Sequence, residues 1–363
     1  MTSGGYLEPA QRAPAALCVP VTVTIVTFNS GRCIEQCLQS VLEQNYARKQ
    51  VIIVDNASSD DTARILKQFE GRVRVVYNRE NVGFAAGQNQ AIALSQAEWV
   101  LVLNPDVRLM PDFISMMVAA GEADLKAGSV CGKLLRMSAD CEIPEERVLD
   151  STGIYFTPSL RHLDRGSQDK DEGRYDEFHY VFGASGAAAL YCREMIGDVS
   201  ISGEFFDSDF FAYREDADVA WRAQLLGWKC VFTPFAVGYH VRTVLPANRR
   251  SLSPVLNMHS VKNRWLMRIK NMTPGLYRRY WLPTTMRDLV VIAGCVLREF
   301  TSLRAFAFVL RNLRRFLKKR RQIMARRRAN DTYMAAWFSY QPVSYPAPQI
   351  ASRLADDQRM AIR

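Results

Sequence analysis

The sequence lacks the short motifs that mark the commonest nucleotide and metal sites. No GxGxxG follows the first hydrophobic run and no GxxxxGK[ST] occurs anywhere, so neither a dinucleotide site nor a P-loop is supported. The 8 cysteines show no CxxC pair, which argues against a cysteine zinc site. Because a chain of 363 residues can bury a core without disulfides, we expect reduced, mostly packed thiols in a cytosolic protein.

Long hydrophobic runs are also missing. A membrane-spanning helix needs roughly 18 to 20 apolar residues. The best candidate, residues 289–297 (LVVIAGCVL), has half that length and lies between Arg287 and Arg298. Residues 1–20, rich in Pro and Ala, have no charged start followed by an apolar core, so we expect a flexible lead and no signal peptide. The sequence therefore indicates a protein that does not span a membrane.

Positive charge is concentrated in one segment. The chain has 47 Lys+Arg and 37 Asp+Glu, a net charge of +10. Residues 311–328 alone contain ten basic residues and no acidic one, so the rest of the chain is electrically balanced. With 48% hydrophobic and 23% charged residues, the composition is that of a globular protein and excludes general disorder or a fibrous fold.

Strand-like and helix-like segments alternate from Val21 to Asn104. Short β-branched or apolar runs, typical of buried parallel strands, are followed by helix starts. The expected strands are 21–27, 51–55, 73–78 and 99–104, and the expected helices run to about Glu43, from Asp60 and over 84–95. This order predicts an α/β fold with a doubly wound, mainly parallel sheet and helices on both faces.

Polar residues follow each expected strand. The four endings are Thr27-Phe28-Asn29, Asp55-Asn56, Asn78 and Asn104-Pro105-Asp106. Because ligands of such sheets bind beyond the carboxyl ends of the strands, we expect a binding site there. Asp55 offers an acceptor-only carboxylate that suits the imide N–H of uracil or thymine. A cap within DNASSDDT is the alternative for this residue.

Two further groups of side chains could carry chemistry. Asp106 could hold Mg²⁺ or Mn²⁺ against two phosphates, although Asn-Pro-Asp is also an ordinary type I turn. Glu215, Asp216 and Asp218 open a helix after an aromatic run, where acidic residues are favourable in any protein. Alternatively, one of them is a general base in a partly desolvated pocket. His240 is either structural, a metal ligand or a diphosphate contact.

Six segments occur in an order that resembles a known family: TIVTFNS, VDNASSDDT, NRENVGFAAGQNQAI, VLNPDV, FGASGAAALY and FFAYREDADVAWRAQLLGW. Together they are similar to glycosyltransferase family 2, and most closely to its bacterial rhamnosyltransferase-like branch, over roughly residues 21–242. The resemblance implies the GT-A nucleotide-diphospho-sugar transferase fold, which is Rossmann-like. It also implies an inverting transferase that takes a sugar from a nucleoside diphosphate and uses a divalent metal, Mg²⁺ or Mn²⁺.

The resemblance assigns roles to individual residues. Asp216 would be the catalytic base that deprotonates the acceptor hydroxyl, Asp106 the metal-binding carboxylate, and His240 a further metal or diphosphate ligand. The nucleotide sugar would be bound by Thr27, Asn29, Asp55, Asn81, Gly83, Asn89, Asn104, Gly186 and Glu215. The sequence departs from the family at Asn104, a neutral amide in place of the first carboxylate of the Asp-x-Asp metal motif. His240 could supply the missing ligand.

Basic and large apolar residues are interspersed from about residue 256 onward, with almost no acids. Arg264 and Trp265 open this stretch and are candidates for a donor loop. Within 303–328, apolar residues at helical spacing stand beside arginines, so we expect an amphipathic helix that binds an anionic membrane surface. A solvated helix that closes the domain is the alternative. Nucleic-acid binding is set aside because no nucleic-acid motif accompanies the basic residues.

The expected division of the chain is a lead (1–20), a catalytic domain (21–255), a basic membrane-associating helical region (256–330) and a tail (331–363). The predicted protein is cytoplasmic and peripheral on the inner face of the cell membrane. It would move a sugar, with rhamnose favoured, from a dTDP- or UDP-sugar to a hydroxyl of a lipid-linked saccharide in bacterial surface glycan synthesis. Two alternatives stay open: a polyprenyl-phosphate sugar synthase, and a non-catalytic nucleotide-sugar-binding protein, which Asn104 would favour.

Overall fold

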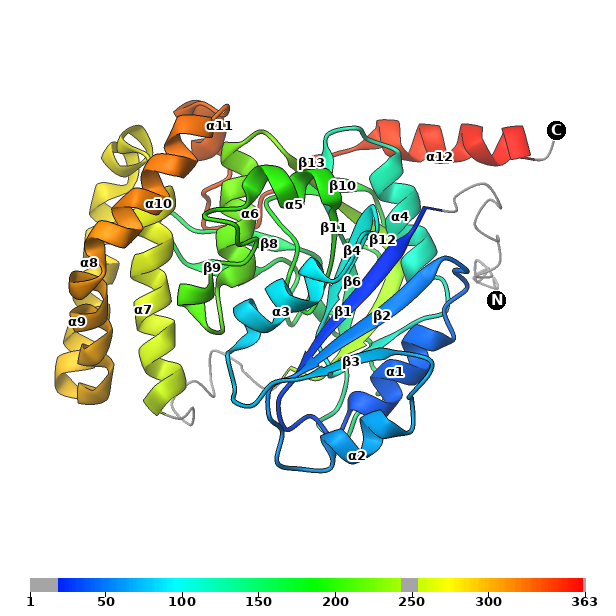
Figure 1. The fold of residues 1–363 in the computed structure, drawn as a ribbon. Coiled ribbons are helices and arrows are strands. Elements are labelled where there is room, and N and C mark those ends of the chain that lie inside the picture. The colour runs from blue at the N-terminus through cyan, green and yellow to red at the C-terminus, as the bar shows by residue number, and fades with distance from the viewer. Residues whose placement is uncertain (1–18, 243–253, 362–363) are drawn as a thin grey trace.

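The computed structural model describes residues 19–242 and 254–361, which are built on one large sheet with helices on both faces (Figure 1). Its N-terminal half is parallel, in the order β3–β2–β1–β4. These strands are β1 (Val21–Thr27), β2 (Lys49–Asp55), β3 (Arg74–Tyr77) and β4 (Trp99–Leu103), connected through α1 (Ile34–Leu42), α2 (Thr62–Lys67) and α3 (Phe84–Ala93). The predicted α/β alternation is therefore confirmed.

The side chains of β4 show how both faces of the sheet are covered. Leu101 and Leu103 point into the hydrophobic cluster under α1 and α4 (Phe113–Glu122). Val100 and Val102 point into the opposite cluster, which contains Trp221 of α6 (Glu215–Leu225). Successive residues of a strand face opposite sides of the sheet. Because both faces of β4 are buried, all its residues have to be apolar.

Beyond β4 the sheet becomes mixed, in the order β4–β11–β6–β12–β10–β13. The strands are β6 (Ala127–Arg136), β10 (His179–Val181), β11 (Ala188–Cys192), β12 (Lys229–His240) and β13 (Tyr345–Pro346), with β5 (Val107–Leu109) paired to β12, β7 (Leu149–Ser151) paired to β6, and a separate hairpin of β8 (Ile154–Phe156) and β9 (His162–Asp164). In the antiparallel β5–β12 register His240 pairs with Val107. This register brings His240 next to Asp106.

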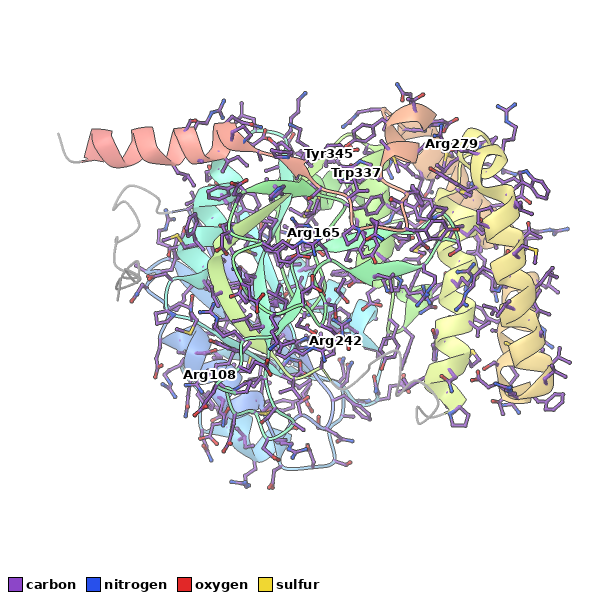
Figure 2. The ribbon with its side chains drawn as sticks, turned by 180° about the vertical axis from the view of Figure 1, so that it is seen from behind. Arg108, Arg165, Arg242, Arg279, Trp337 and Tyr345 are labelled. Carbon is purple, nitrogen blue, oxygen red and sulfur yellow. A yellow bond between two sulfur atoms is a disulfide. The ribbon has the colours of Figure 1, made fainter. Side chains whose placement is uncertain are left out.

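The remaining helices lie mostly at one side of the sheet. They are α5 (Arg193–Val199), η1 (Ser208–Phe210), α7 (Pro254–Asn271), α8 (Pro274–Leu297), η3 (Phe300–Leu303), α9 (Arg304–Arg311), α10 (Leu313–Arg326), α11 (Asp331–Ala336) and α12 (Pro348–Ala361). Helices α7 to α10 stand together at one end of the molecule in both views, and α12 lies far from them (Figures 1 and 2). Within the described parts of the chain, none of the helices combines the length and apolarity that a bilayer crossing needs.

The C-terminal segment packs on the sheet and its helices. The ring of Phe338 lies 5.2 Å from that of Trp221 and 5.5 Å from that of Phe156. Trp337 contacts Tyr345, with ring centroids 4.9 Å apart, and the two residues lie side by side in Figure 2. Strand β13 adds to the edge of the sheet through β10. Residues 331–350 thus bury aromatic side chains that the sequence pattern did not single out.

The amphipathic helix expected within 303–328 is present, but its apolar side faces inward. Val309 of α9 and Phe316 and Ile323 of α10 are buried, in the same cluster as Leu266 and Met267 of α7. Basic side chains remain on the outer side of α9 and α10. Much of the apolar stripe therefore packs on α7, while Leu310 and Leu317 stay exposed, and membrane contact through residues 303–328 stays a prediction.

The expectation of reduced cysteines is wrong for one pair. Cys33, just before α1, is disulfide-bonded to Cys141 across 108 residues. The segment that follows β6 returns over the loop after β1, and a pairing of this kind leaves no local spacing pattern. Free thiols are found, as expected, at Cys37, Cys131, Cys192, Cys230 and Cys295.

Candidate active site

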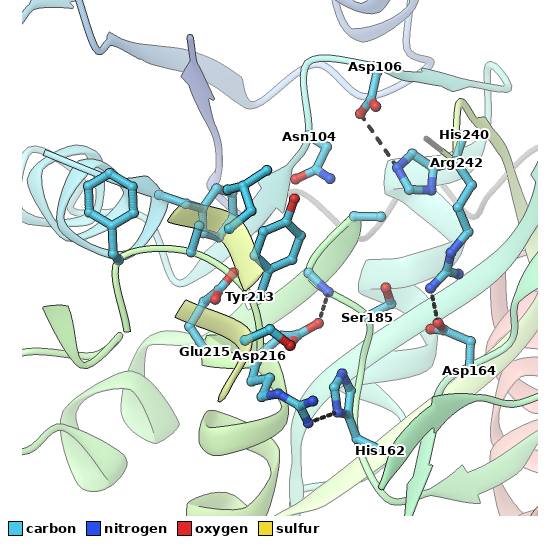
Figure 3. Close-up of a pocket in the computed structure, with 18 of the residues that line it drawn as sticks. Asn104, Asp106, His162, Asp164, Ser185, Tyr213, Glu215, Asp216, His240 and Arg242 are labelled. Atoms are coloured by element: carbon cyan, nitrogen blue, oxygen red, sulfur yellow. Dashed lines mark hydrogen bonds and ion pairs between the residues drawn. The ribbon is translucent and has the colours of Figure 1, made fainter. Parts of the chain in front are cut away.

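A cleft of about 1250 Å³ opens at the carboxyl ends of β1 and β4 and extends to α7 and α8. Two groups of predicted residues meet in it, with Asn104, Asp106 and His240 on one side and Glu215 and Asp216 on the other (Figure 3). The predicted residues that line the cleft are Asn29, Asn81, Gly83, Asn104, Asp106, Gly186, Glu215, Asp216 and His240. The polar residues of the strand ends therefore converge at one site.

Asp55 lies just below the cleft, at the end of β2, and is 2% exposed. Its carboxylate accepts hydrogen bonds from Thr27 Oγ1 (2.8 Å) and Ser58 Oγ (2.6 Å), both on Oδ1, and from the Ser58 backbone N–H (3.1 Å) on Oδ2. The parallel register, which pairs Thr27 with Asp55, produces the first of these bonds. Asp55 thus orders the turn after β2, as the cap alternative predicted, and Oδ2 keeps further acceptor capacity.

Asn29 connects the loops after β1 and β2. Its φ of 52° lies in the left-handed region, which asparagine tolerates better than most residues. Its side-chain oxygen accepts a hydrogen bond from the Ser59 N–H (2.8 Å), and its own N–H donates to Ser58 Oγ (2.9 Å). These bonds hold the cleft wall in place, and Asn29 itself faces the cleft.

Gly83 makes a close approach that no other residue could make. Its φ is +86°, and a Cβ built on it would lie 2.6 Å from the carbonyl oxygen of Phe211. Asn81 Oδ1 accepts the Gly83 N–H at 2.9 Å, and Asn56 Nδ2 donates to the Gly83 carbonyl at 3.1 Å. The glycine therefore allows the start of α3 to pack on the loop that carries Phe211.

Asn89 does not line the cleft. Its Nδ2 donates to the Phe206 carbonyl (2.6 Å), and its Oδ1 accepts the Phe206 N–H (2.9 Å). Both halves of the amide are thus used to tie α3 to the segment before η1.

Asp106 and His240 form the polar side of the cleft opposite Asp216. His240 Nε2 lies 3.5 Å from Asp106 Oδ1, and Nδ1 lies 2.8 Å from Asp150 Oδ2. Burial alone would lower the pKa of His240, but the two carboxylates outweigh it and raise the pKa to about 10. Asp150 is fully buried and also pairs with Arg242, so sequence reasoning missed a residue that orients two others. No motif surrounds Asp150 in the sequence.

These residues fit a divalent cation. The carboxylate of Asp150 is hydrogen-bonded to Nδ1 of His240, so Nε2 points toward Asp106. A histidine that binds a metal through one nitrogen usually has such a partner on the other. Carboxylate oxygen suits Mg²⁺ and Mn²⁺, and Asn104 faces the same cleft. Among the residues that the structure describes, no three His, Cys, Asp or Glu side chains converge on one point. Phosphate oxygens of a donor would therefore have to complete the ligand set.

Asp216 lies at the N-terminus of α6, facing the cleft. Its Oδ2 accepts the Gly186 N–H (2.9 Å) and its Oδ1 accepts the Ala217 N–H (2.7 Å). Burial raises the pKa of Asp216 despite these two donors, and burial together with the Asp216 charge raises the pKa of Glu215 to about 8. Near neutral pH Glu215 is therefore largely protonated, and the raised pKa of Asp216 suits a proton acceptor beside it.

The loop before α6 is held in an unusual conformation. Phe211, Tyr213 and Arg214 have φ values of 66°, 70° and 71°, all in the left-handed region. Asn263 of α7 donates from Nδ2 to the carbonyls of Phe210 (2.9 Å), Ala212 (2.8 Å) and Tyr213 (2.7 Å). A helix from the C-terminal region thus sets the geometry of the loop that positions Asp216, which sequence reasoning did not anticipate.

Arg264, a candidate for a donor loop, lines the far end of the cleft but is 5% exposed. Its guanidinium donates to Asp288 of α8 (3.0 Å) and to the carbonyls of Ser159 and Leu160 (3.1 and 3.2 Å). It therefore ties α7 to α8 and to the β8–β9 hairpin. Its neighbour Trp265 packs edge-on against Phe306, with centroids 5.8 Å apart.

Comparison with known proteins places this chain beside glycosyltransferases. The family model described as Glycosyl transferase family 2 matches residues 22–198. An N-acetylglucosaminyl-diphospho-decaprenol L-rhamnosyltransferase from Mycobacterium tuberculosis is 27% identical over 237 residues, 60% of this chain and 75% of that protein. A poly-beta-1,6-N-acetyl-D-glucosamine synthase from Staphylococcus aureus is 23% identical over 219 residues, 60% of this chain and 48% of the synthase.

Solved structures share the fold. GalNAc-T7, crystallised with UDP, GalNAc and Mn²⁺, matches with a TM-score of 0.58 at 12% identity, covering 72% of this chain and 50% of GalNAc-T7. TarS from S. aureus matches with a TM-score of 0.50 at 16% identity, covering 77% of this chain and 45% of TarS. Identity at this level establishes the fold alone, and this chain spans about half of each of these proteins.

The fold and the family match together define a glycosyltransferase of the GT-A class. Residues 22–198 belong to glycosyl transferase family 2, so the family that the sequence motifs resemble is confirmed.

Proposed function

We propose that this enzyme transfers a sugar, with inversion, from a dTDP- or UDP-sugar to a hydroxyl of a lipid-linked saccharide. The observation that carries the proposal is that Asp216 and the Asp106–His240 pair line one cleft. Inversion needs one base on the side opposite the leaving group and a means of neutralising the departing diphosphate. Asp216, with its raised pKa and its fixed position, fits the base.

Asp106, His240 and Asn104 would hold Mg²⁺ or Mn²⁺. The bound cation would supply charge neutralisation for the diphosphate leaving group. Asp150 and Arg242 would keep His240 in place through the contacts described above. Asn29 lines the end of the cleft at β1 and β2, where a pyrimidine nucleoside would bind, and Thr27 and Asp55 lie buried beneath it and would support that end. Gly186 would let the backbone approach Asp216 and the sugar closely.

The acceptor is proposed from the relatives. The rhamnosyltransferase named above acts on an N-acetylglucosaminyl-diphospho-lipid, and rhamnose is accordingly the sugar we favour. A lipid-linked acceptor would place the enzyme on the cytoplasmic face of the cell membrane, in the synthesis of a bacterial surface glycan. The basic outer side of α9 and α10 is consistent with such a position.

The proposal is tested by Asp216→Asn, which keeps the size of the side chain and removes the base. We expect transfer from dTDP-rhamnose to a lipid-linked acceptor to fall by about 10² to 10⁴-fold, with nucleotide binding nearly unchanged. Thermal stability should fall modestly, because the amide can accept only one of the two backbone N–H bonds that Asp216 accepts. Asp61→Asn is the matched control, because Asp61 also lies at the start of a helix but is exposed and lies outside the cleft. Near-normal turnover by Asp216→Asn would refute the mechanism.

Product analysis decides between the remaining functions. A glycolipid in which the sugar is joined directly to a lipid phosphate would identify a polyprenyl-phosphate sugar synthase.

Asn104, which replaces a carboxylate in the metal motif, is the feature that would favour a protein that binds nucleotide sugars without turning them over. That function predicts nucleotide binding in calorimetry that is the same with and without Mn²⁺, and no transfer to any acceptor.

A further inference from the structure

The outer face of α8 is apolar where a helix of a water-soluble protein is usually polar. Every exposed residue between positions 281 and 297 is apolar. Val290 is 58% exposed and Leu297 is 75% exposed, and Trp281, Leu282, Met286 and Leu289 are each more than half exposed. An apolar face of this extent on one helix indicates that something covers it.

The inner face of α8 is correspondingly polar. Thr284 and Asp288 are buried, and Asp288 pairs with Arg264 and Arg268 of α7. The helix is therefore turned with its polar residues toward the protein and its apolar residues toward the outside. The buried ion pairs fix this orientation, because an unpaired buried carboxylate would be strongly unfavourable.

Positive charge surrounds the apolar face. Arg278 and Arg279 near the start of α8 and Arg298 directly after its end are exposed, and Arg279 is visible at that end in Figure 2. On the neighbouring helices Arg304, Arg311 and Arg314 are exposed as well. Between positions 273 and 330 the sequence has only two acidic residues, Asp288 and Glu299. An apolar face bordered by arginines complements an anionic lipid surface.

The same helix reaches the cleft. Arg287 and Val291 of α8, together with Val261 of α7, line its far end. A surface on which α8 lies would therefore be close to the cleft opening, on the side away from the nucleoside end.

We propose that the exposed face of α8 docks on an anionic phospholipid bilayer, with its apolar side chains inserted among the headgroups and the flanking arginines on lipid phosphates. The function of this contact, delivery of a lipid-linked acceptor to the cleft, rests on the proposed function above. The docking itself does not depend on the identity of the sugar.

The test is flotation of the full-length protein with vesicles of phosphatidylglycerol and phosphatidylcholine that contain no acceptor. Leu289→Ser/Val296→Ser removes two exposed apolar side chains of α8, so binding should weaken by about tenfold or more. Leu125→Ser is the control, because Leu125 is 90% exposed and lies between α4 and β6, away from α8. Arg278→Gln/Arg279→Gln should weaken binding and reduce its dependence on salt.

Three results would overturn the docking proposal: no binding of the native protein to anionic vesicles, unchanged binding of the serine variant, or a dimer in sedimentation experiments that the serine variant dissociates while vesicles bind neither form. The last result would identify a second copy of the chain as the partner. Circular dichroism and thermal unfolding check that the variants fold. Transfer to a short-chain, water-soluble acceptor should be unchanged in the serine variant, so failure of docking and failure of catalysis are distinguishable.

Discussion

Asn263 offers the sharpest test of how the C-terminal helices contribute to catalysis. This side chain is fully buried, and its Nδ2 lies within 2.9 Å of three carbonyl oxygens of the loop before α6. Three residues of that loop are in the left-handed region, a conformation that costs about 1–2 kcal/mol for each residue with a side chain. Asn263→Ala should therefore release the loop, and with it the start of α6 and Asp216.

The magnitude follows from the hydrogen bonds. An amide NH₂ has two hydrogens, so Nδ2 makes two full bonds, or shares them among the three carbonyls. Each net bond contributes about 0.5–1.5 kcal/mol, and buried carbonyls left without a donor add to the loss. We expect Asn263→Ala to lower the free energy of unfolding by about 2–4 kcal/mol. A displacement of the base by about 1 Å should lower kcat by roughly 10²-fold, while KM for the donor changes little.

The assay combines urea unfolding with steady-state transfer kinetics. Asn271→Ala is the matched control, since Asn271 lies on the same helix, is equally buried and donates one hydrogen bond to Asp218 (2.8 Å). That variant should lose stability but keep kcat, because Asp218 does not line the cleft. If Asn263→Ala lost stability to the same extent and kept kcat, Asn263 would have no role in positioning the base.

Two further predictions concern Gly83 and Glu215. Gly83→Ala should cost about 2–4 kcal/mol of stability and most of the activity. Gly71 is the control: its φ is also positive (+82°), but a Cβ added to it would meet no atom within 4 Å, so Gly71→Ala should cost only about 1–2 kcal/mol. Equal losses of stability in unfolding experiments would refute the close contact between Gly83 and Phe211. Because the pKa of Glu215 is raised to about 8 from an ordinary value near 4.5, folding disfavours its ionised form, and stability should fall as pH rises between these values, by at most about 1.4 kcal/mol per pH unit. Glu215→Gln should remove this decline, and identical pH profiles for the two proteins would contradict the raised pKa.

The first half of the fold was predictable because its signals are local. Each parallel strand is a short apolar run followed by a polar residue, and a helix start follows at once. The register of β1 with β2 and β4 then brings Thr27 and Asp55 together and leads to the cleft at Asn104. The convergence of Asp106 and His240 could also be predicted, because parallel strands end at a common edge. Asp216 opens α6 and does not end a strand, so its place was implied only by the resemblance to the family.

What could not be predicted depends on contacts between distant segments. Asp150 orients His240 across 90 residues, and the disulfide joins Cys33 to Cys141 across 108. Asn263 reaches a loop about 50 residues earlier in the sequence. No period or spacing within the sequence encodes such pairs, because each arises only when the loops after different strands fold over one another.

The basic C-terminal region shows why a count of charges is not a map of a surface. Lys270 is fully buried and pairs with Asp207 (2.5 Å) and Asp218 (2.9 Å), and Lys319 pairs with Asp207 (2.6 Å) and Asp209 (2.8 Å). The two lysines outweigh the effect of burial and hold the pKa of Asp207 well below its usual range. These lysines therefore balance buried acidic residues at positions 207–218, so they are not available to lipid. The positive charge that can contact a membrane is the smaller set of exposed arginines on and around α8, α9 and α10. What distinguishes this side of the molecule is the exposed apolar face of α8, which comes from an apolar stretch of sequence too short to span a bilayer.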